Sequence, residues 1–262
     1  MQVAGYIAAL FIGISLGLIG GGGSILTVPV LVYLFGISPI IATSYSLFVV
    51  GSTSLVGSFN SYRKGFVDIR TVFLFGISSI ITVFITRKFV IPHIPENIMI
   101  GKTVIHFSVL TMILFAVLLL LASVSMIKSK QVEVTDGEYK TGFSKLLLYG
   151  ISIGLVTGFL GAGGGFLLIP ALVLLLHLPM KKAVGTSLLI IALNSLAGFI
   201  GDIGHFQTNW AFLLTISLIA IAGVFAGSLL GRSVNGVKLK KAFGWFVLVM
   251  GIYIIIKEIW FR

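Results

Sequence analysis

Two stretches of this chain repeat one another: GLIGGGGSILTVPVLV begins at Gly17, and GFLGAGGGFLLIPALV begins at Gly158. Shifting one half of the chain by 141 positions places Gly20 on Gly161 without a gap. The same shift aligns further pairs on both sides: Gly13 with Gly154, Pro29 with Pro170, Ser46 with Ser187, Ser54 with Ser195 and Gly57 with Gly198. We therefore expect a duplicated unit with helix-breaking glycines at equivalent depths of both halves.

The composition is that of a membrane protein. Hydrophobic residues make up 58% of the chain and charged residues 10%, whereas roughly 25% would be charged in a soluble domain. The net charge of +11 lies mostly in short loops between apolar segments, so it indicates orientation in the bilayer and not nucleic-acid binding.

Apolar segments recur along the whole chain, most of them near the roughly 20 residues that a bilayer crossing needs. We expect residues 1–127 to form a first transmembrane repeat, residues 128–143 a cytoplasmic linker and residues 144–262 a second repeat. The expected segments are 3–19, 24–38, 41–60, 69–91 and 103–127, then 144–160, 165–178, 183–201, 208–231 and 240–261.

Lysine and arginine are unevenly distributed between the two sides of this arrangement. If each segment reverses direction, one side collects most of the basic residues, and the positive-inside rule makes that side cytoplasmic with both termini outside. Because five is an odd number, the second half runs opposite to the first, as in the inverted repeats of transporters. Segments 24–38 and 165–178 either cross fully or form re-entrant hairpins, since both alternatives preserve the sidedness.

The glycine runs are the predicted binding site. Helices that restart at Ile25 and Phe166 would point N-terminal donors at the glycines, and such termini bind anions. Two facing termini could hold one small anion without a fixed charge. The alternative is that the glycines only permit close helix packing. The predicted site residues of the runs are Gly20, Gly22, Gly23 and Ser24, with Gly161, Gly163, Gly164 and Gly165.

Polar side chains that follow the runs could complete the ligand shell. Hydroxyl and amide groups donate hydrogen bonds to anions, although serine and threonine in membrane helices also satisfy their own backbone. The predicted ligands are Ser46, Thr186, Ser187 and Asn194. Asp202 and His205 could relay protons or gate, but a solvated turn is the favoured interpretation.

Enzyme signatures do not support a catalytic role. The sequence contains no cysteine, no HExxH and no Walker A lysine, and a single aspartate near a helix end lacks the partner that a carboxylate pair requires. No catalytic residue, metal site or cofactor is predicted.

The duplicated GxGG with its following proline, AVGTS at residues 183–187 and its weaker partner ATSYS at residues 42–46 resemble the TauE/SafE family of sulfite and organosulfonate exporters. The resemblance covers essentially the whole chain. It implies secondary transport of small anions such as sulfite or sulfoacetate across the bacterial cytoplasmic membrane, coupled to a gradient of protons or another ion. The duplication is imperfect, because Gly21 aligns with Ala162, Ser24 with Gly165 and Thr53 with Asn194.

The sequence thus predicts an all-α integral membrane protein, an inverted repeat of two five-segment halves with short or broken helices after the glycine runs. The predicted function is alternating-access export of small anions, with the lipid bilayer, the anionic substrate and a coupling ion as partners. A membrane-embedded enzyme or accessory subunit, or an anion channel, are the alternatives.

Overall fold

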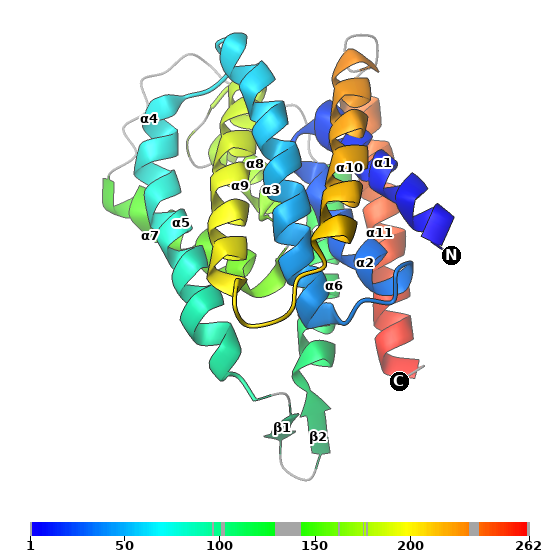
Figure 1. Ribbon diagram of the computed structural model, residues 1–262. Coiled ribbons are helices and arrows are strands. Elements are labelled where there is room, and N and C mark those ends of the chain that lie inside the picture. Colours follow the sequence, from blue (N-terminus) through cyan, green and yellow to red (C-terminus); the bar gives the residue numbers. More distant parts are fainter. Residues whose placement is uncertain are drawn as a thin grey trace.

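The computed structural model describes residues 2–95, 97–100, 103–128, 143–161, 163–174, 176, 178–230 and 236–260. These residues form a bundle of helices (Figure 1), so the prediction of an all-α membrane fold is confirmed. The predicted linker falls mainly on residues 129–142, which lie outside the described residues.

The first half contains three long helices, a short segment after the first glycine run, and a helix interrupted by two π-helical turns. Its elements are α1 (Gln2–Ile19), the 3₁₀ segment η1 (Gly21–Leu26), α2 (Thr27–Tyr33), α3 (Pro39–Arg63), α4 (Ile69–Thr71), the π-helical turn η2 (Val72–Gly76), α5 (Ile77–Ile85), the π-helical turn η3 (Thr86–Val90), η4 (Ile91–His93) and α6 (Phe107–Lys128).

The second half repeats this order with fewer interruptions. Its elements are α7 (Phe143–Leu160), α8 (Gly165–Leu174), α9 (Met180–Asp202), α10 (Trp210–Leu230) and α11 (Gly236–Trp260).

A short hairpin departs from the predicted segments. Strands β1 (Asn97–Ile100) and β2 (Thr103–His106) pair antiparallel, with Asn97 opposite His106, so α6 begins at Phe107 and not at 103. Thr103, Val104 and Ile105 are β-branched, and such residues favour strands over helices. The hairpin extends beyond one end of the bundle (Figure 1).

Five helical stretches of the described chain are long and apolar enough to cross a membrane: Pro39–Arg63, Ile69–His93, Phe107–Val124, Lys181–Asp202 and Trp210–Leu230. Large apolar side chains project outward from them, with Phe73 62% and Leu218 65% exposed. Water would oppose this exposure and lipid favours it. The apolar helical stretches beside the glycine runs are shorter: Val3–Leu18, Gly23–Tyr33 and Leu146–Leu160.

The closest contacts between helices are made at glycines. Gly13 and Gly17 of α1 approach the backbone of α10 at Ala220 and Val224 so closely that a Cβ at either glycine would overlap a carbonyl oxygen. α7 packs in the same way on α5 and the turns that flank it, where a Cβ on Gly154 would lie 2.7 Å from the Ser79 carbonyl oxygen. Small residues of this kind let membrane helices approach at backbone distance.

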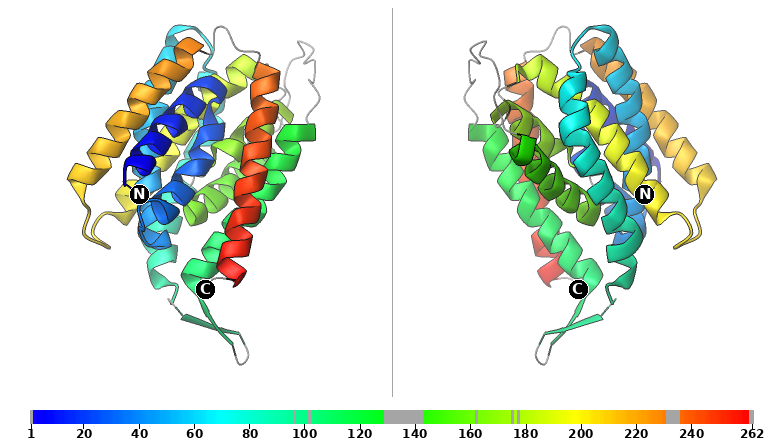
Figure 2. Two further views of the ribbon diagram at one scale, coloured as in Figure 1. Left: turned by 90° about the vertical axis from the view of Figure 1, so that its right-hand side faces the viewer. Right: turned by 90° about the vertical axis from the view of Figure 1, so that its left-hand side faces the viewer.

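The other main contacts join matching helices of the two halves. α3 and α9 lie side by side and run in opposite directions (Figure 1). α6 and α11 lie together on one flank of the bundle (Figure 2).

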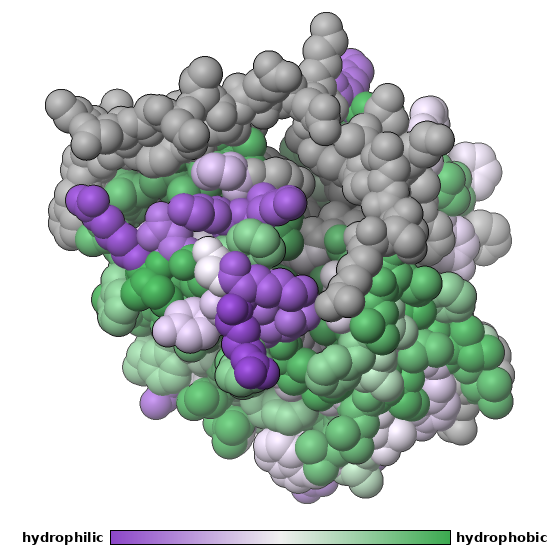
Figure 3. Space-filling model, turned by 90° about the horizontal axis from the view of Figure 1, so that it is seen from above, coloured by the Kyte–Doolittle hydropathy of each residue, from purple (hydrophilic) through white to green (hydrophobic). Residues whose placement is uncertain are grey.

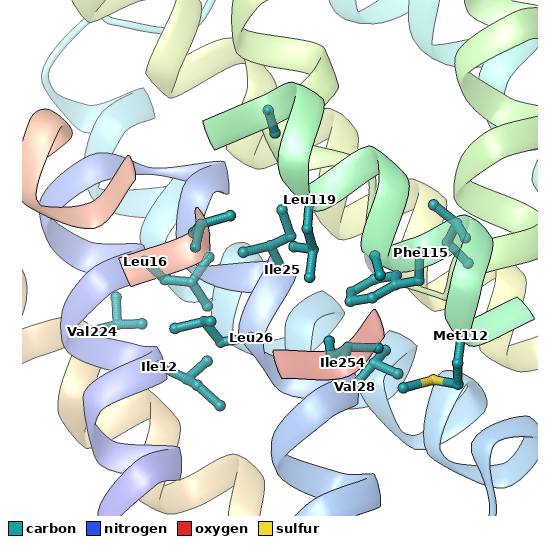
Figure 4. Close-up of a cluster of buried hydrophobic side chains, with 14 residues drawn as sticks. Ile12, Leu16, Ile25, Leu26, Val28, Met112, Phe115, Leu119, Val224 and Ile254 are labelled. Carbon is teal, nitrogen blue, oxygen red and sulfur yellow. The ribbon is translucent and has the colours of Figure 1, made fainter. Parts of the chain in front are cut away.

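One hydrophobic cluster packs around α1, η1 and α2, which together we call the first hairpin. Ile25 and Leu26 of η1 and Val28 of α2 pack with Phe115 and Leu119 of α6 (Figure 4). All five side chains are at most 8% exposed. The residues that follow the first glycine run are therefore fixed by apolar packing.

Candidate functional site

The two glycine runs meet directly. A Cβ on Gly21 would lie 2.6 Å from the Cα of Gly165, and a Cβ on Gly165 would overlap the carbonyl oxygen of Gly21. Only residues without a side chain allow this approach, because real Cβ contacts lie at 3.4–4 Å. Segments 144 positions apart in the chain thus form one feature, and both runs are buried around it.

The helices after the two runs start differently. α8 begins at Gly165, one residue before the predicted start, after the left-handed glycines Gly161, Gly163 and Gly164. Its first N–H groups have no partner within the helix, so they can donate to a bound group. In the first half the 3₁₀ segment begins at Gly21, within the run and well before the predicted start at Ile25. The structure therefore presents one α-helical N-terminus at the site, and not two.

Polar side chains surround the second run. A Cβ atom added to Gly163 would lie 2.9 Å from Ser195 Oγ. One added to Gly164 would contact Thr157 Oγ1. Both hydroxyl oxygens are buried and have no hydrogen-bond partner among the described residues. A buried polar group without a partner costs free energy, so these hydroxyls favour a polar ligand beside the run.

Gly161 borders a buried ion pair. Arg87 Nη1 lies 3.1 Å from Asp202 Oδ2 and donates to Thr43 Oγ1 at 3.1 Å. The side chains of Arg87 and Asp202 are 1% and 6% exposed. The Arg87 Nη2 atom lies 2.6 Å from the position of a Cβ on Gly161, so the guanidinium lies against the run.

This ion pair corrects the interpretation of Asp202 as part of a solvated turn, which was wrong. The exposed His205 fits that interpretation, but Asp202 is buried. The sequence does not indicate this pair, because its two charges lie 115 residues apart, each near the end of its own segment. One signal was available: Arg87 falls inside the apolar segment 69–91, and an ionisable residue within a membrane helix is a functional candidate by default.

The side chains that border the first run are apolar. The position of a Cβ on Gly20 lies 2.6 Å from Val184 Cγ1, and that on Gly23 lies 2.9 Å from Leu16 Cγ. The Ser24 hydroxyl donates to the Gly21 carbonyl oxygen at 2.8 Å. The run contributes backbone to the meeting point, and its serine is satisfied locally. Gly22 lies within the 3₁₀ segment.

The remaining predicted ligands are all buried, but most of them already have partners. Thr186 Oγ1 accepts the Asp68 N–H at 2.9 Å, and Ser187 donates to the Val184 carbonyl oxygen at 2.9 Å. Asn194 Nδ2 donates to Ser79 Oγ at 2.7 Å, which leaves its side-chain oxygen unpaired. The Ser46 hydroxyl has no partner among the described residues. Whether these side chains bind substrate stays a prediction.

We call the end of the bundle where α3 ends and α9 begins the basic end. A separate pocket opens there. The pocket has a volume of about 750 Å³, apolar walls that include Phe59 and Phe225, and Arg63 and Lys64 at its edge. Hydrophilic side chains gather on this end when it is viewed from above (Figure 3). The pocket shares no lining residue with the glycine runs, so it is not the predicted site.

Comparison with known proteins gives a consistent result. Residues 6–254 match the family model described as sulfite exporter TauE/SafE. A Xylella fastidiosa protein named probable membrane transporter protein is 28% identical, and the match covers 93% of this chain and 91% of the relative. The Bacillus subtilis proteins named probable membrane transporter protein YunE and YdhB are 30% and 26% identical, and the matches cover 91% and 88% of this chain and 89% and 91% of the relatives. No solved structure matches the chain.

Proposed function

Because the chain belongs to the sulfite exporter TauE/SafE family, we propose that it exports small anions, sulfite or organosulfonates, across the bacterial cytoplasmic membrane by alternating access. Family membership makes it a membrane transporter, and its apolar spans make it a multi-pass membrane protein. The specific substrate, the outward direction and coupling to an ion gradient are part of the proposal.

The observation that carries the proposal is the meeting of the two runs beside unpaired donors. The N-terminus of α8, the Thr157 and Ser195 hydroxyls and the Arg87 guanidinium all lie along the second run. N–H and guanidinium groups only donate, and hydroxyls donate readily, so a small anion would satisfy this set. A cation would leave most of these donors unpaired.

The helix contacts support the inverted repeat. α5 and α10 occupy the same place in the two halves, as do α1 and α7. In the structure α1 packs on α10, and α7 packs on α5, so each half contributes one member to each pair. A pseudo-twofold axis would exchange these two contacts and leave the α3 and α9 contact unchanged. We propose that rocking about this axis exposes the runs to each side in turn.

The distribution of basic residues supports the proposed orientation. The end of α3 and the start of α9, with Arg63, Lys64, Lys181 and Lys182, lie at the basic end. By the positive-inside rule this end is cytoplasmic, which would place both termini outside. This orientation holds whether segments 24–38 and 165–178 cross fully or form re-entrant hairpins, because both arrangements give the later loops the same sidedness.

The buried ion pair argues against the alternative of a membrane enzyme. An intramembrane aspartyl protease needs two carboxylates close together, whereas Asp202 is paired with Arg87. A channel has no comparable argument against it and is distinguished by its conductance.

The direct test is transport of sulfite and sulfoacetate by purified protein in liposomes, with electrical recording to exclude a channel. Thr157→Val and Ser195→Ala should slow transport, because each removes a hydroxyl beside the second run. Thr215→Val is the matched control, since the Thr215 hydroxyl is exposed and bonded to its own helix at 2.7 Å. Equal transport by all variants would place the substrate elsewhere, and a wild-type protein that moves neither anion would refute the proposed function.

A further inference from the structure

The polar groups at the site are unequal between the halves, and this inequality points to one residue. We propose that Arg87 binds the charged head of the substrate, through the edge of its guanidinium that carries Nε and Nη2. The inference rests on the proposed function and extends it, because a site built only from helix termini would contain no fixed charge.

The first step is the hydrogen bonding of Arg87 itself. Nη1 donates to Thr43 and to Asp202, both at 3.1 Å, which accounts for its two protons. Nε and Nη2 have no partner among the described residues, although the side chain is 1% exposed. These two nitrogens form the edge with parallel N–H bonds that arginine uses to bind two oxygens of one anion.

The second step is where this edge lies. Nη2 is the guanidinium atom that contacts the position of a Cβ on Gly161. The next glycines along the run border Ser195 and Thr157, whose buried hydroxyls are also without partners. Donors from three elements therefore line the same short run before α8 begins: Arg87 from η3, Thr157 from α7 and Ser195 from α9.

The third step is the role of Asp202. Its carboxylate contacts Nη1, the nitrogen outside the unpaired edge. It neutralises Arg87 within the bundle, and with Thr43 it fixes the plane of the guanidinium. We therefore assign Asp202 as a positioning residue. A sulfonate head at the opposite edge adds one negative charge, which the N-terminus of α8 offsets with roughly half a positive charge.

The repeat shows that this charge belongs to one half alone. The shift of 141 positions places Arg87 on Ser228, Thr43 on Val184 and Asp202 on Ser61. Val184 accordingly borders Gly20 as Thr43 borders Gly161. The charged head should therefore bind beside Gly161 and not beside Gly20, whose neighbours Val184 and Ile169 are apolar.

The test compares an oxyanion with a halide. Wild type, Arg87→Lys and the exposed neighbour Lys88→Gln are purified in detergent, and the affinities for sulfoacetate and bromide are measured by calorimetry. Lysine keeps the positive charge but lacks the two parallel N–H bonds of the guanidinium edge. Arg87→Lys should therefore weaken sulfoacetate binding about tenfold or more. It should leave bromide binding nearly unchanged. Lys88→Gln changes the total charge outside the site and should bind both anions as the wild type does.

A second variant protects the test against misfolding. Arg87→Gln combined with Asp202→Asn removes both charges together, so neither remains buried without its partner, and it should also lose sulfoacetate affinity. Wild-type affinity in Arg87→Lys or in the double variant would overturn the role of Arg87 and leave the proposed function intact. A wild-type protein that binds neither anion would overturn both.

Discussion

Gly165→Ala tests whether the two glycine runs touch at backbone distance. The new Cβ would lie 2.5 Å from the Gly21 Cα and 2.7 Å from its carbonyl carbon. Ordinary contacts begin at 3.4 Å, so the runs would have to separate by about 1 Å in a tightly packed interior. Overpacking of this kind costs about 1–3 kcal/mol of unfolding free energy.

The sign of this effect is informative, because helix propensity acts in the opposite direction. Gly165 is the first residue of α8 and has no left-handed backbone, so alanine fits its conformation and would stabilise an uncrowded helix by up to about 1 kcal/mol. Gly57→Ala is the matched control, because its Cβ would meet Leu188 no closer than 3.5 Å.

Thermal unfolding in detergent distinguishes the two variants. A loss of 1–3 kcal/mol corresponds to a fall in Tm of about 2–4 °C for each kcal/mol in a protein of this size, whereas Gly57→Ala should keep or raise the Tm. Transport by Gly165→Ala should fall as well, since the separated runs alter the site. If Gly165→Ala were as stable as Gly57→Ala, the runs would not be in contact as described.

Three further outcomes follow from buried groups. Arg87→Met and Asp202→Ala should each destabilise the protein by about 3–5 kcal/mol, and the double variant by much less than their sum, because each single change leaves a buried charge; additive losses in denaturant unfolding would contradict this. Asn194→Ala and Ser79→Ala should each cost about 1–3 kcal/mol and be strongly non-additive, because they share one hydrogen bond of 2.7 Å; independent effects on the Tm would exclude that bond. Phe115→Ala should cost about 3–5 kcal/mol by opening a cavity in the cluster that holds the first hairpin; a change below 1 kcal/mol would show that the cluster rearranges freely.

Much of the fold was predictable because membrane helices carry strong local signals. The long apolar segments around α3, α6, α9 and α10 appear near their expected positions, since a bilayer crossing needs a continuous apolar stretch. The hairpin at Asn97–His106 was missed because its apolar β-branched residues adjoin an apolar helix, and hydropathy alone does not separate the two.

The site was predictable in its location and less so in its chemistry. The repeated glycines identified the two runs that meet at Gly21 and Gly165. Side-chain roles depend on which partners the folded chain provides, and sequence gives no access to these. Thr186 is already bonded to the Asp68 backbone, whereas Thr157, which was not predicted, contacts the run. Symmetry in the sequence also suggested two similar termini, but the first run continues into a 3₁₀ segment.

The wide turn that carries Arg87 has a mechanical consequence. Thr86–Val90 is π-helical, a form that holds one more residue per hydrogen-bonded turn than the α-helix and that often occurs at functional sites. If this turn returned to α-helical bonding, the residues on one side of it would rotate relative to the other by about 100°, the angle of a single residue. The guanidinium would then swing away from Gly161 with no movement of the hairpin that carries the glycines. An exchange of backbone hydrogen bonds within one helix, together with breakage of the 3.1 Å Arg87–Asp202 ion pair, would therefore withdraw the guanidinium from the run.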